Sequence, residues 1–485
     1  MSFKHGISVS ESDTALTTPI ESTAGLQVAW GTAPVNLAKD PYAATNQIIV
    51  AHNFREASEK VGYSDDYEKY TLCQSIDATF KIKNVAPIIL INVLDPKVHK
   101  KANAEKTYNL GNGMVTLDED GILLDTLVVK DYTSTTTYVV NTDYVATFIN
   151  GKVTIAVIDG GALEGQSKIV VTSDSIDPTM VTKNDIIGGL DAITQKETGF
   201  ELIRQIYPKT GMTAGLLSAP GWTHDATVAA VLQAKCENIN SLFLCQCLID
   251  IDTTEATTYD KVKEQKEAQG VSSKNAIACW PLVQSGDKRY YYSAVLSAVT
   301  AYTDATRNDV PYKSPSNEDA GITGTVLADG TEVVLDLEQA NMVNSVGVCT
   351  ALNMNGWKTW GNYTAAYPST TDVKDIWICV RRMLTWWENS FILTYWNKVD
   401  DPANYRLIKS ICDSENIRAN SYKAQNMIAG LNISFREEDN SIADILAGKI
   451  KFKTYYAFYT PAQSIENDFE FDPTILSKAL FGGES

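Results

Sequence analysis

The stretch PIILINVL, residues 87–94, decides the fold class of this chain. Every residue of 88–94 is apolar except Asn92, and Pro87 and Pro96 flank the run. A continuous apolar run of this length between turn residues predicts a β-strand that is buried on both faces. Strands of that kind belong to parallel sheets with helices on either side, so we expect an α/β core around this segment.

Predicted strands and helices alternate on both sides of this stretch. Upstream, LQVAWGTAP (26–34) predicts a strand, and FREASEKVG (54–62) and YTLCQSIDATFKIK (70–83) predict helices. Downstream of residue 185 the order is helix 185–208, strand 214–221, helix 225–239, strand 241–250, helix 255–269, strand 276–283 and helix 290–306. Repeated strands with helical crossovers predict a mainly parallel sheet flanked by helices.

The last third of the chain changes pattern. A long helix is predicted over 372–396, DVKDIWICVRRMLTWWENSFILTYW, and a second over 406–428. Two alternating runs follow, LNISFRE (431–437) and KIKFKTYYAFYT (449–460), and they predict a pair of strands at the end of the core.

Residues 101–185 have a different composition, in which Thr, Val, Tyr, Asp and Gly dominate and helical periodicity disappears. Short alternating runs are separated by turn signals, among them Asn150-Gly151 and Gly160-Gly161. We therefore expect an inserted all-β, sandwich-like domain.

Each end of the chain carries an isolated predicted strand. Near the start, Ile7 and Val9 alternate with serines, and near the end Ile465, Phe469 and Phe471 lie in SIENDFEFD. A single strand cannot satisfy its own backbone groups, so each must pair with a sheet elsewhere. The predicted division is an N-terminal arm (1–25), the first part of the core (26–100), the β domain (101–185), the main core (186–460) and a C-terminal arm (461–485).

Composition narrows the possible functions. A net charge of -18 opposes binding to nucleic acid, and no apolar run is long enough to span a bilayer. The eight cysteines include no C-x-x-C pair and the four histidines are dispersed, so we expect no metal site and no cofactor. The start, MSFKHGISVSESD, has no apolar run behind its basic residues, so no signal peptide and no membrane anchor are expected.

The parallel sheet and Asp250 suggest an alternative, an α/β enzyme or ligand-binding protein with a site near Asp250. Asp250 and Asp252 follow a buried strand, where carboxylates bind metals or act as acid and base, although a turn explains them as well. The loop GGALEGQSK (160–168) has Gln166 where a phosphate loop needs lysine, and it predicts a β-hairpin turn. Neither G-x-S-x-G nor H-E-x-x-H is present, so we predict no catalytic residues. A third possible function is that of an adhesive surface protein that binds through the β domain. Such a protein would need an export signal, which is not expected here.

A small basic group stands out in the acidic chain. Arg381 and Arg382, near Lys374, lie on the predicted helix 372–396, and Lys423 lies on the next one. They form either a solvated face or a contact surface for an acidic partner.

Several motifs, in order, resemble the contractile tail sheath family. They are VAWGTAPVN with NFREASEKVGY and PIILINV, then TGFELIRQIYPKTGMTAGLLSAPGW and LFLCQCLID, then WPLV with the helix and loop up to Pro315 and Asn317, and finally LEQANMVNSVGVCTAL, WKTWGNYT and DIWICVRRMLTWWENSF. The resemblance covers about 1–100 and 185–471. It leaves out the β domain, which is similar to the variable outward-facing domains of larger sheaths.

This resemblance implies a structural protein and not an enzyme. Sheath subunits stack as six-fold rings around an inner tail tube and contract to drive that tube through a target cell envelope. The implied partners are other copies, the tube, baseplate and tail terminator proteins, with no direct contact to nucleic acid or membrane. The implied location is a virion tail or bacteriocin particle assembled in the host bacterial cytoplasm. Strand donation would use Ile7, Val9, Ile465, Phe469 and Phe471, and tube contact Arg381, Arg382 or Lys423.

Overall fold

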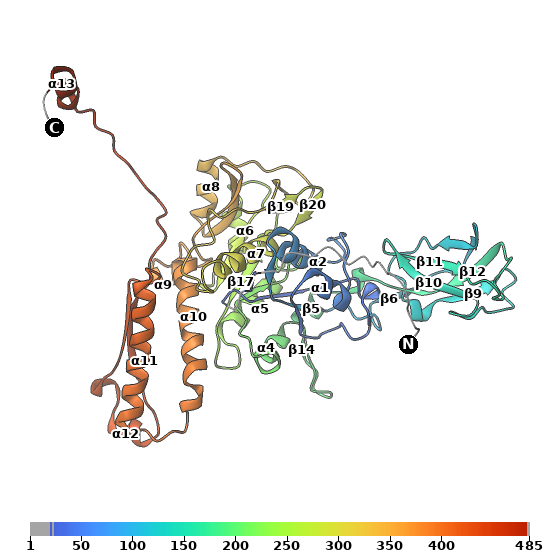
Figure 1. Ribbon diagram of the computed structural model, residues 1–485, viewed down its shortest axis with the longest axis horizontal. Coiled ribbons are helices and arrows are strands. Elements are labelled where there is room, and N and C mark those ends of the chain that lie inside the picture. The colour runs from blue at the N-terminus through green and yellow to red at the C-terminus, as the bar shows by residue number, and fades with distance from the viewer. Residues whose placement is uncertain (1–19, 22–23, 483–485) are drawn as a thin grey trace, which may run out of the picture.

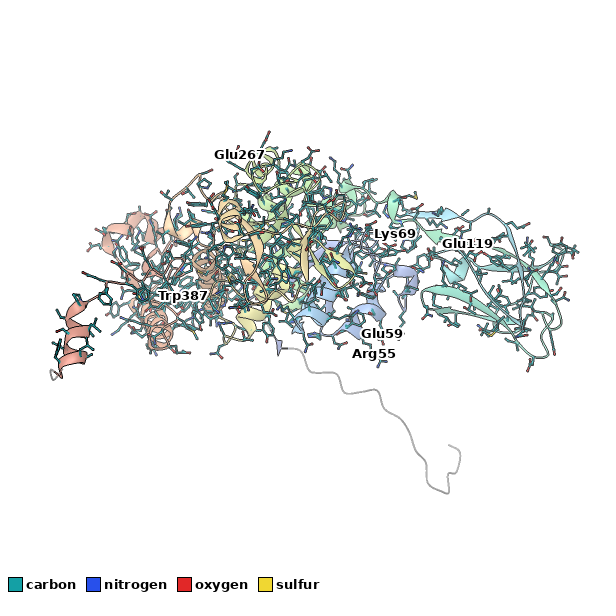
Figure 2. The ribbon with its side chains drawn as sticks, turned by 90° about the horizontal axis from the view of Figure 1, so that it is seen from above. Arg55, Glu59, Lys69, Glu119, Glu267 and Trp387 are labelled. Carbon is teal, nitrogen blue, oxygen red and sulfur yellow. The ribbon has the colours of Figure 1, made fainter. Side chains whose placement is uncertain are left out.

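The computed structural model describes residues 20–21 and 24–482. A helix-covered sheet forms the body of the molecule, and a group of strands and a pair of long helices lie at opposite ends of it (Figure 1). Glu119 among the strands and Trp387 on one of the long helices mark these two ends (Figure 2). The predicted N-terminal strand with Ile7 and Val9 lies outside the described residues.

The central sheet has eight strands in the order β23-β22-β18-β17-β16-β2-β5-β3. The six inner strands run parallel, as predicted, and β3 and β23 add antiparallel edges. Their bounds are β2 (Gln27–Gly31), β3 (Ile49–Ala51), β5 (Ile88–Asn92), β16 (Leu216–Ser218), β17 (Gln246–Asp250), β18 (Ala276–Cys279), β22 (Val348–Asn353) and β23 (Trp357–Trp360). The fold is therefore α/β, built on one large mixed sheet.

Strand β5, the segment PIILINVL, is buried on both faces as its sequence predicts. Ile89 and Ile91 belong to the main hydrophobic cluster, whereas Ile88 and Leu90 join a smaller cluster. Helices α1 (Phe54–Val61) and α2 (Leu72–Asp77) contribute to that smaller cluster. Alternating side chains thus fill two separate cores, which is the reason that no polar face remains on this strand.

Four further helices belong to the body: α5 (Ala226–Glu237), α6 (Val262–Ala268), α7 (Tyr292–Ala305) and α8 (Leu337–Asn344). Helix α7 is buried along nearly its whole length, and it contacts β16 and β17. A small sheet of β19 (Leu282–Ser285), β20 (Lys288–Tyr290) and β21 (Gly324–Val326) lies beside it, and β1 (Ile20–Glu21) pairs with β4 (Val85–Ala86).

The prediction of one helix over 185–208 is wrong. The segment forms α3 (Lys183–Ile187), a hairpin of β14 (Gly189–Leu190) and β15 (Glu197–Thr198), and α4 (Ile203–Thr210). Gly188 and Gly199 interrupt the helix with φ of 65° and 55°. A Cβ on Gly188 would lie 1.9 Å from the carbonyl oxygen of Thr198, so this turn requires glycine.

Residues 106–172 form two three-stranded antiparallel sheets that share a hydrophobic cluster of their own. One sheet contains β8 (Met114–Thr116), β10 (Tyr144–Ile149) and β11 (Lys152–Val157), and the other β7 (Lys106–Asn109), β9 (Val128–Asp131) and β12 (Lys168–Thr172). An antiparallel pair, β6 (Lys100–Ala102) and β13 (Asp174–Ile176), joins them to the body.

The loop 160–168 is not a hairpin turn as predicted, because it connects β11 to β12 in the other sheet. Both edges of β11 are already paired with β10 and β8, so the next strand has to begin elsewhere.

The C-terminal part consists of α9 (Val373–Ile376), α10 (Ile378–Tyr395), α11 (Tyr405–Ala424), β24 (Gly430–Phe435), α12 (Ile442–Leu446) and β25 (Phe452–Ala457). The predicted helix 372–396 is split at Trp377, whose backbone is extended. Helices α10 and α11 lie side by side, and the chain then runs through 458–472 without regular structure to α13 (Pro473–Phe481), far from the body (Figure 1).

Candidate assembly interface

Strands β24 and β25 form a two-stranded antiparallel hairpin, with pairs running from Gly430 and Ala457 to Phe435 and Phe452. Within the described chain no third strand joins it. Helix α11 covers the edge of β24: the Asn416 side chain donates to the Ile433 carbonyl oxygen at 3.1 Å and accepts from the Ile433 N–H at 3.0 Å. The hairpin is therefore a small sheet with one edge covered by a helix.

A groove of about 540 Å³ lies between this hairpin and α10. Its lining is mainly apolar and includes Leu384, Trp387, Phe391, Ile392, Leu431, Ile433, Ile450, Phe452, Tyr456 and Phe458. Trp387 is fixed by a 3.0 Å bond from its indole N–H to Glu415, and the Arg418 guanidinium lies 4.3 Å from its ring centre. An open apolar groove beside a two-stranded sheet is suited to receive another strand.

The predicted C-terminal strand lies on the tail beyond β25. Ile465, Phe469 and Phe471 are 87%, 88% and 77% exposed, and they pair with no strand among the described residues. Their donation to another sheet stays a prediction. The last segment, ILSKALF, forms helix α13, which also exposes Ile475 and Leu480.

Arg381 and Arg382 do not form the predicted contact surface. Each is only 5% exposed. The Arg382 guanidinium is paired with Asp304 on α7, and Arg381 donates to Asn275 at 2.9 Å and lies 3.5 Å from Asp375. Both side chains point inward because α10 packs against the body. In the sequence, Asp304 is an isolated acid on an otherwise apolar helix, and a buried acid of this kind indicates a basic partner such as Arg382.

Of the predicted basic group, Lys423 in the last turn of α11 is exposed. It therefore remains available for a contact, and its role stays a prediction.

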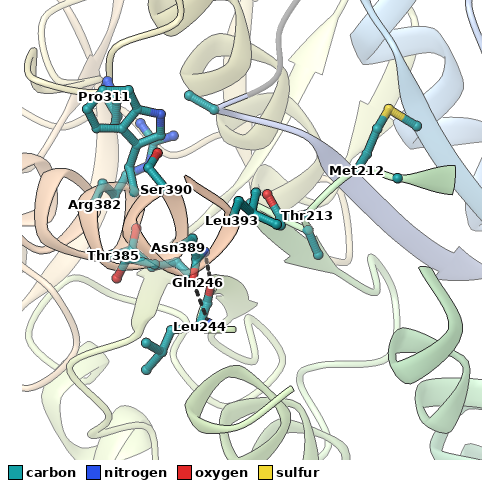
Figure 3. A pocket seen from close by; sticks show the side chains of 15 residues that line it. Met212, Thr213, Leu244, Gln246, Pro311, Arg382, Thr385, Asn389, Ser390 and Leu393 are labelled. Carbon is teal, nitrogen blue, oxygen red and sulfur yellow. Dashed lines mark hydrogen bonds between the residues drawn. The ribbon is translucent and has the colours of Figure 1, made fainter. Parts of the chain in front are cut away.

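A pocket of about 240 Å³ lies beside Arg382, between α10 and residues 211–215 (Figure 3). The Asn389 side chain holds the segment next to it, donating to the Leu244 carbonyl oxygen at 2.7 Å and accepting from the Leu244 N–H at 3.1 Å. Among the described residues that line this pocket, Arg382 carries the single ionisable group, and it is engaged by Asp304. This lining offers no acid and base pair for catalysis.

Asp250 does not form the enzyme site that the alternative requires. Its carboxylate is buried and accepts bonds from the Ser293 N–H at 2.9 Å, the Ser293 hydroxyl at 2.5 Å and the Thr223 hydroxyl at 3.3 Å. Burial raises the pKa of Asp250 to about 6 against these hydrogen bonds. The residue ties the end of β17 to the start of α7, which is a structural role.

Asp252 stabilises a turn, accepting from the N–H and hydroxyl of Thr254 at 2.8 Å each. In the described chain no group of three or more His, Cys, Asp or Glu side chains could hold a metal ion. None of the described helices is both long and apolar enough to cross a membrane.

Known proteins provide an independent comparison. No family model matches the chain. A tail sheath protein of Burkholderia phage BcepMu is 25% identical over 486 residues, covering 96% of each chain. A tail sheath protein of Escherichia phage P2 is 24% identical over 298 residues, covering 59% of this chain and 69% of the relative.

Two solved structures share the fold over nearly the whole chain. The anti-feeding prophage baseplate, 6-fold symmetrised, matches with a TM-score of 0.58 at 14% identity, covering 97% of this chain and 100% of the matched one. The sheath complex of the extracellular contractile injection system PVC in the contracted state also gives 0.58 at 14% identity, with 98% and 99% covered. The chain is therefore similar in sequence to phage tail sheath proteins, in one case over nearly its whole length, and it shares its fold with chains of contractile injection systems.

Proposed function

We propose that this chain is a sheath subunit that polymerises as stacked hexameric rings around an inner tail tube and contracts to drive the tube through a target cell envelope. One observation carries the proposal. The same chain holds a two-stranded hairpin beside an apolar groove and a tail that exposes Ile465, Phe469 and Phe471. These parts are complementary, so identical copies can be joined head to tail in an open helical array.

In this proposal both terminal arms donate strands to neighbouring copies, the N-terminal one through Ile7 and Val9. After β25, Phe458 packs in a hydrophobic cluster and residues 459–465 line a cavity of the body, and the described chain then leads away from it (Figure 1). This tail can serve as a tether while the bodies slide past one another. The assembled extended state would be metastable, and its conversion to a contracted packing would supply the energy without nucleotide. The role is structural, with no catalytic step.

The proposed partners are other copies of this chain, a tail tube protein, and baseplate and tail terminator proteins. The location would be a virion tail or a bacteriocin particle, assembled in the host cytoplasm, with the strands of 106–172 facing outward. Lys423 is the remaining candidate for tube contact, because it is exposed at the end of α11. Lys423→Glu should reduce the amount of tube protein that sediments with the sheath and leave sheath polymers intact; an unchanged ratio would remove this residue from the interface.

Negative-stain electron microscopy of the purified full chain tests the proposal directly. We expect striated tubes or ring stacks. A variant that lacks residues 1–20 should remain a folded monomer and form no tubes. A discrete monomer or dimer from the full chain under all assembly conditions, or normal tubes from the deletion variant, would contradict the proposal.

A further inference from the structure

We propose that the cavity beside Lys266 is a binding site for a carboxylate group, and that the buried ammonium of Lys266 is its charged anchor. The cavity has a volume of about 200 Å³, and its lining comes from α6, from Val346 before β22 and from residues 365–369. It shares no residue with the groove beside the β24–β25 hairpin. The site therefore does not depend on the proposed function.

Lys266 lies on α6 with its charged end inside the protein. The residue is 6% exposed, and its Nζ donates to the carbonyl oxygens of Val346 at 2.6 Å and Tyr367 at 2.9 Å. A lysine ammonium has three N–H donors, so these two bonds leave one donor over. Within the described chain, no carboxylate lies within ion-pair distance of this ammonium.

An ammonium without a carboxylate partner is costly to bury. The two carbonyl oxygens replace only part of its hydration, and burial lowers the pKa of Lys266 to about 8. At pH 7 the side chain is still mainly protonated, so a positive charge stays inside the body. Glu267 does not balance this charge, because adjacent residues on a helix do not face each other. Its side chain is exposed at the outer surface of the body (Figure 2).

The two loops that hold the ammonium also form the wall of the cavity. Val346 lines it, and so does Pro368, which follows Tyr367. Gly347 has a φ of 70°, and a Cβ there would lie 2.5 Å from the Tyr367 carbonyl oxygen and 3.1 Å from the Lys266 Nζ. The backbone thus packs closely around the ammonium on this side. A further acceptor has room on the side of the cavity.

The rest of the lining selects the kind of anion. Ser272 and Ser369 line the cavity, and their hydroxyls form no hydrogen bonds with other described residues, so both can donate to a bound oxygen. Lys263 adds a positive charge to the lining and Glu267 a negative one, which leaves the net charge of Lys266. A carboxylate matches one positive charge, whereas a phosphate dianion would exceed it.

Two sources can supply such a carboxylate. One is a small organic acid, and the other is an Asp or Glu side chain of a second copy of this chain. The chain carries 59 Asp and Glu residues against 41 Lys and Arg, so a neighbouring copy has unpaired acids to offer. The chemistry at Lys266 is the same in both cases.

Thermal unfolding of the purified full chain at pH 7 tests the site. If acetate replaces chloride at about 100 mM, and its Kd is about a tenth of that, the melting temperature should rise by about 2 °C. Lys266→Met should lose this response, because methionine fills a similar space without charge. Lys261→Met, exposed just before α6 and outside the cavity, should keep it. An equal response in Lys266→Met would overturn the proposal.

Ser369→Glu decides the question even if Lys266→Met does not fold. Ser369 is exposed and lines the cavity, so a glutamate there can place a carboxylate of the same chain in the site. In chloride this variant should melt about 2 °C above the wild type, and acetate should add nothing. Thr371→Glu, exposed and outside the cavity, should behave like the wild type in both salts. A wild-type acetate response in Ser369→Glu would contradict the site.

Carbodiimide cross-linking identifies the source, because it forms an amide between an amine and a carboxylate in contact with it. Tubes are grown from an equal mixture of unlabelled and heavy-isotope copies. A Lys266 peptide joined to an acidic peptide of the other isotope assigns the carboxylate to a second copy. Absence of this product, with the acetate response present, assigns it to a free acid. If no tubes form, the proposed function fails, and the melting experiments still decide whether the site exists.

Discussion

Arg382 on α10 and Asp304 on α7 form a two-pronged ion pair in the interior. The Arg382 Nη1 donates to Asp304 Oδ1 at 2.9 Å, and Nη2 bonds the second oxygen. The side chains are 4% and 1% exposed. On its other side α10 lines the groove next to the β24–β25 hairpin. The ion pair therefore connects the helix beside this proposed assembly surface to α7, which packs on the central sheet.

Loss of this arginine should destabilise the protein strongly. Arg382→Met leaves the Asp304 carboxylate buried without its partner, and we expect the free energy of unfolding to fall by about 3–5 kcal/mol in urea titrations at pH 7. The double variant Arg382→Met with Asp304→Leu should regain most of that loss, because no uncompensated charge remains. Lys423→Ala, on the exposed end of α11, should change the free energy of unfolding by less than about 0.5 kcal/mol. Equal effects of Arg382→Met and Lys423→Ala would contradict the structural role.

Asp250 should make stability fall as the pH rises from about 4 to about 6. Its pKa in the folded state is about 6, whereas an aspartate in an unfolded chain has a pKa of about 3.9. Between these values the folded state binds a proton that the unfolded state has released, so the free energy of unfolding declines with pH.

Asp250→Asn removes that titration. Relative to the wild type, the variant should gain about 2.4 kcal/mol between pH 4 and pH 8, whatever its offset at pH 4. Urea titrations at both pH values measure this difference. Parallel pH profiles of the two proteins would show that the buried carboxylate does not titrate in this window.

The strands of 106–172 should be removable. Ala102 pairs with Asp174, and the Asn103 N–H donates to the Ser173 carbonyl oxygen at 2.8 Å, so the ends of the segment lie side by side. Deleting 104–172 with Ser173→Gly creates an Asn-Gly turn between β6 and β13, which suits a two-residue hairpin.

The shortened chain loses Leu123, which packs in the main cluster with Ile176. We expect a loss of about 2–5 kcal/mol, matched by Leu123→Ala in the full chain, and tubes that still form. Urea unfolding measures the loss of stability, and electron microscopy shows whether tubes form. A chain that no longer folds would show that the body depends on this segment for more than Leu123.

Much of the fold could be predicted from local patterns. Apolar runs such as 88–94 indicated the buried parallel strands, and alternation with helical segments indicated the sheet between helices. Helix 185–208 was mispredicted because a glycine pair and a later glycine impose left-handed turns, which periodicity alone does not weigh. The loop 160–168 was misassigned because pairing partners depend on which edges are already occupied.

The candidate site was predicted only in part. Alternation in 449–460 correctly identified a hairpin strand, since alternation is a property of the chain itself. The strand predicted from alternation in 465–471 is not formed in the described chain, where 458–472 has no regular structure. The positions of Arg381 and Arg382 could not be predicted in this way, because a helix presents all its sides and only packing decides which becomes buried. The same is true of Asn416, whose amide covers one edge of the hairpin from a helix.

The sequence by itself determined that this chain has an α/β core, strands between 101 and 185, and a segment near its C-terminus in which apolar and acidic residues alternate. Those features depend on the periods of strands and helices and on turn residues, which act over a few neighbours. Only the tertiary structure decided that the basic pair on α10 faces inward, that Asp250 ties a strand to a helix, and that β25 keeps its edge open. Each of these depends on contacts between residues far apart in the chain, where burial and pairing set the outcome.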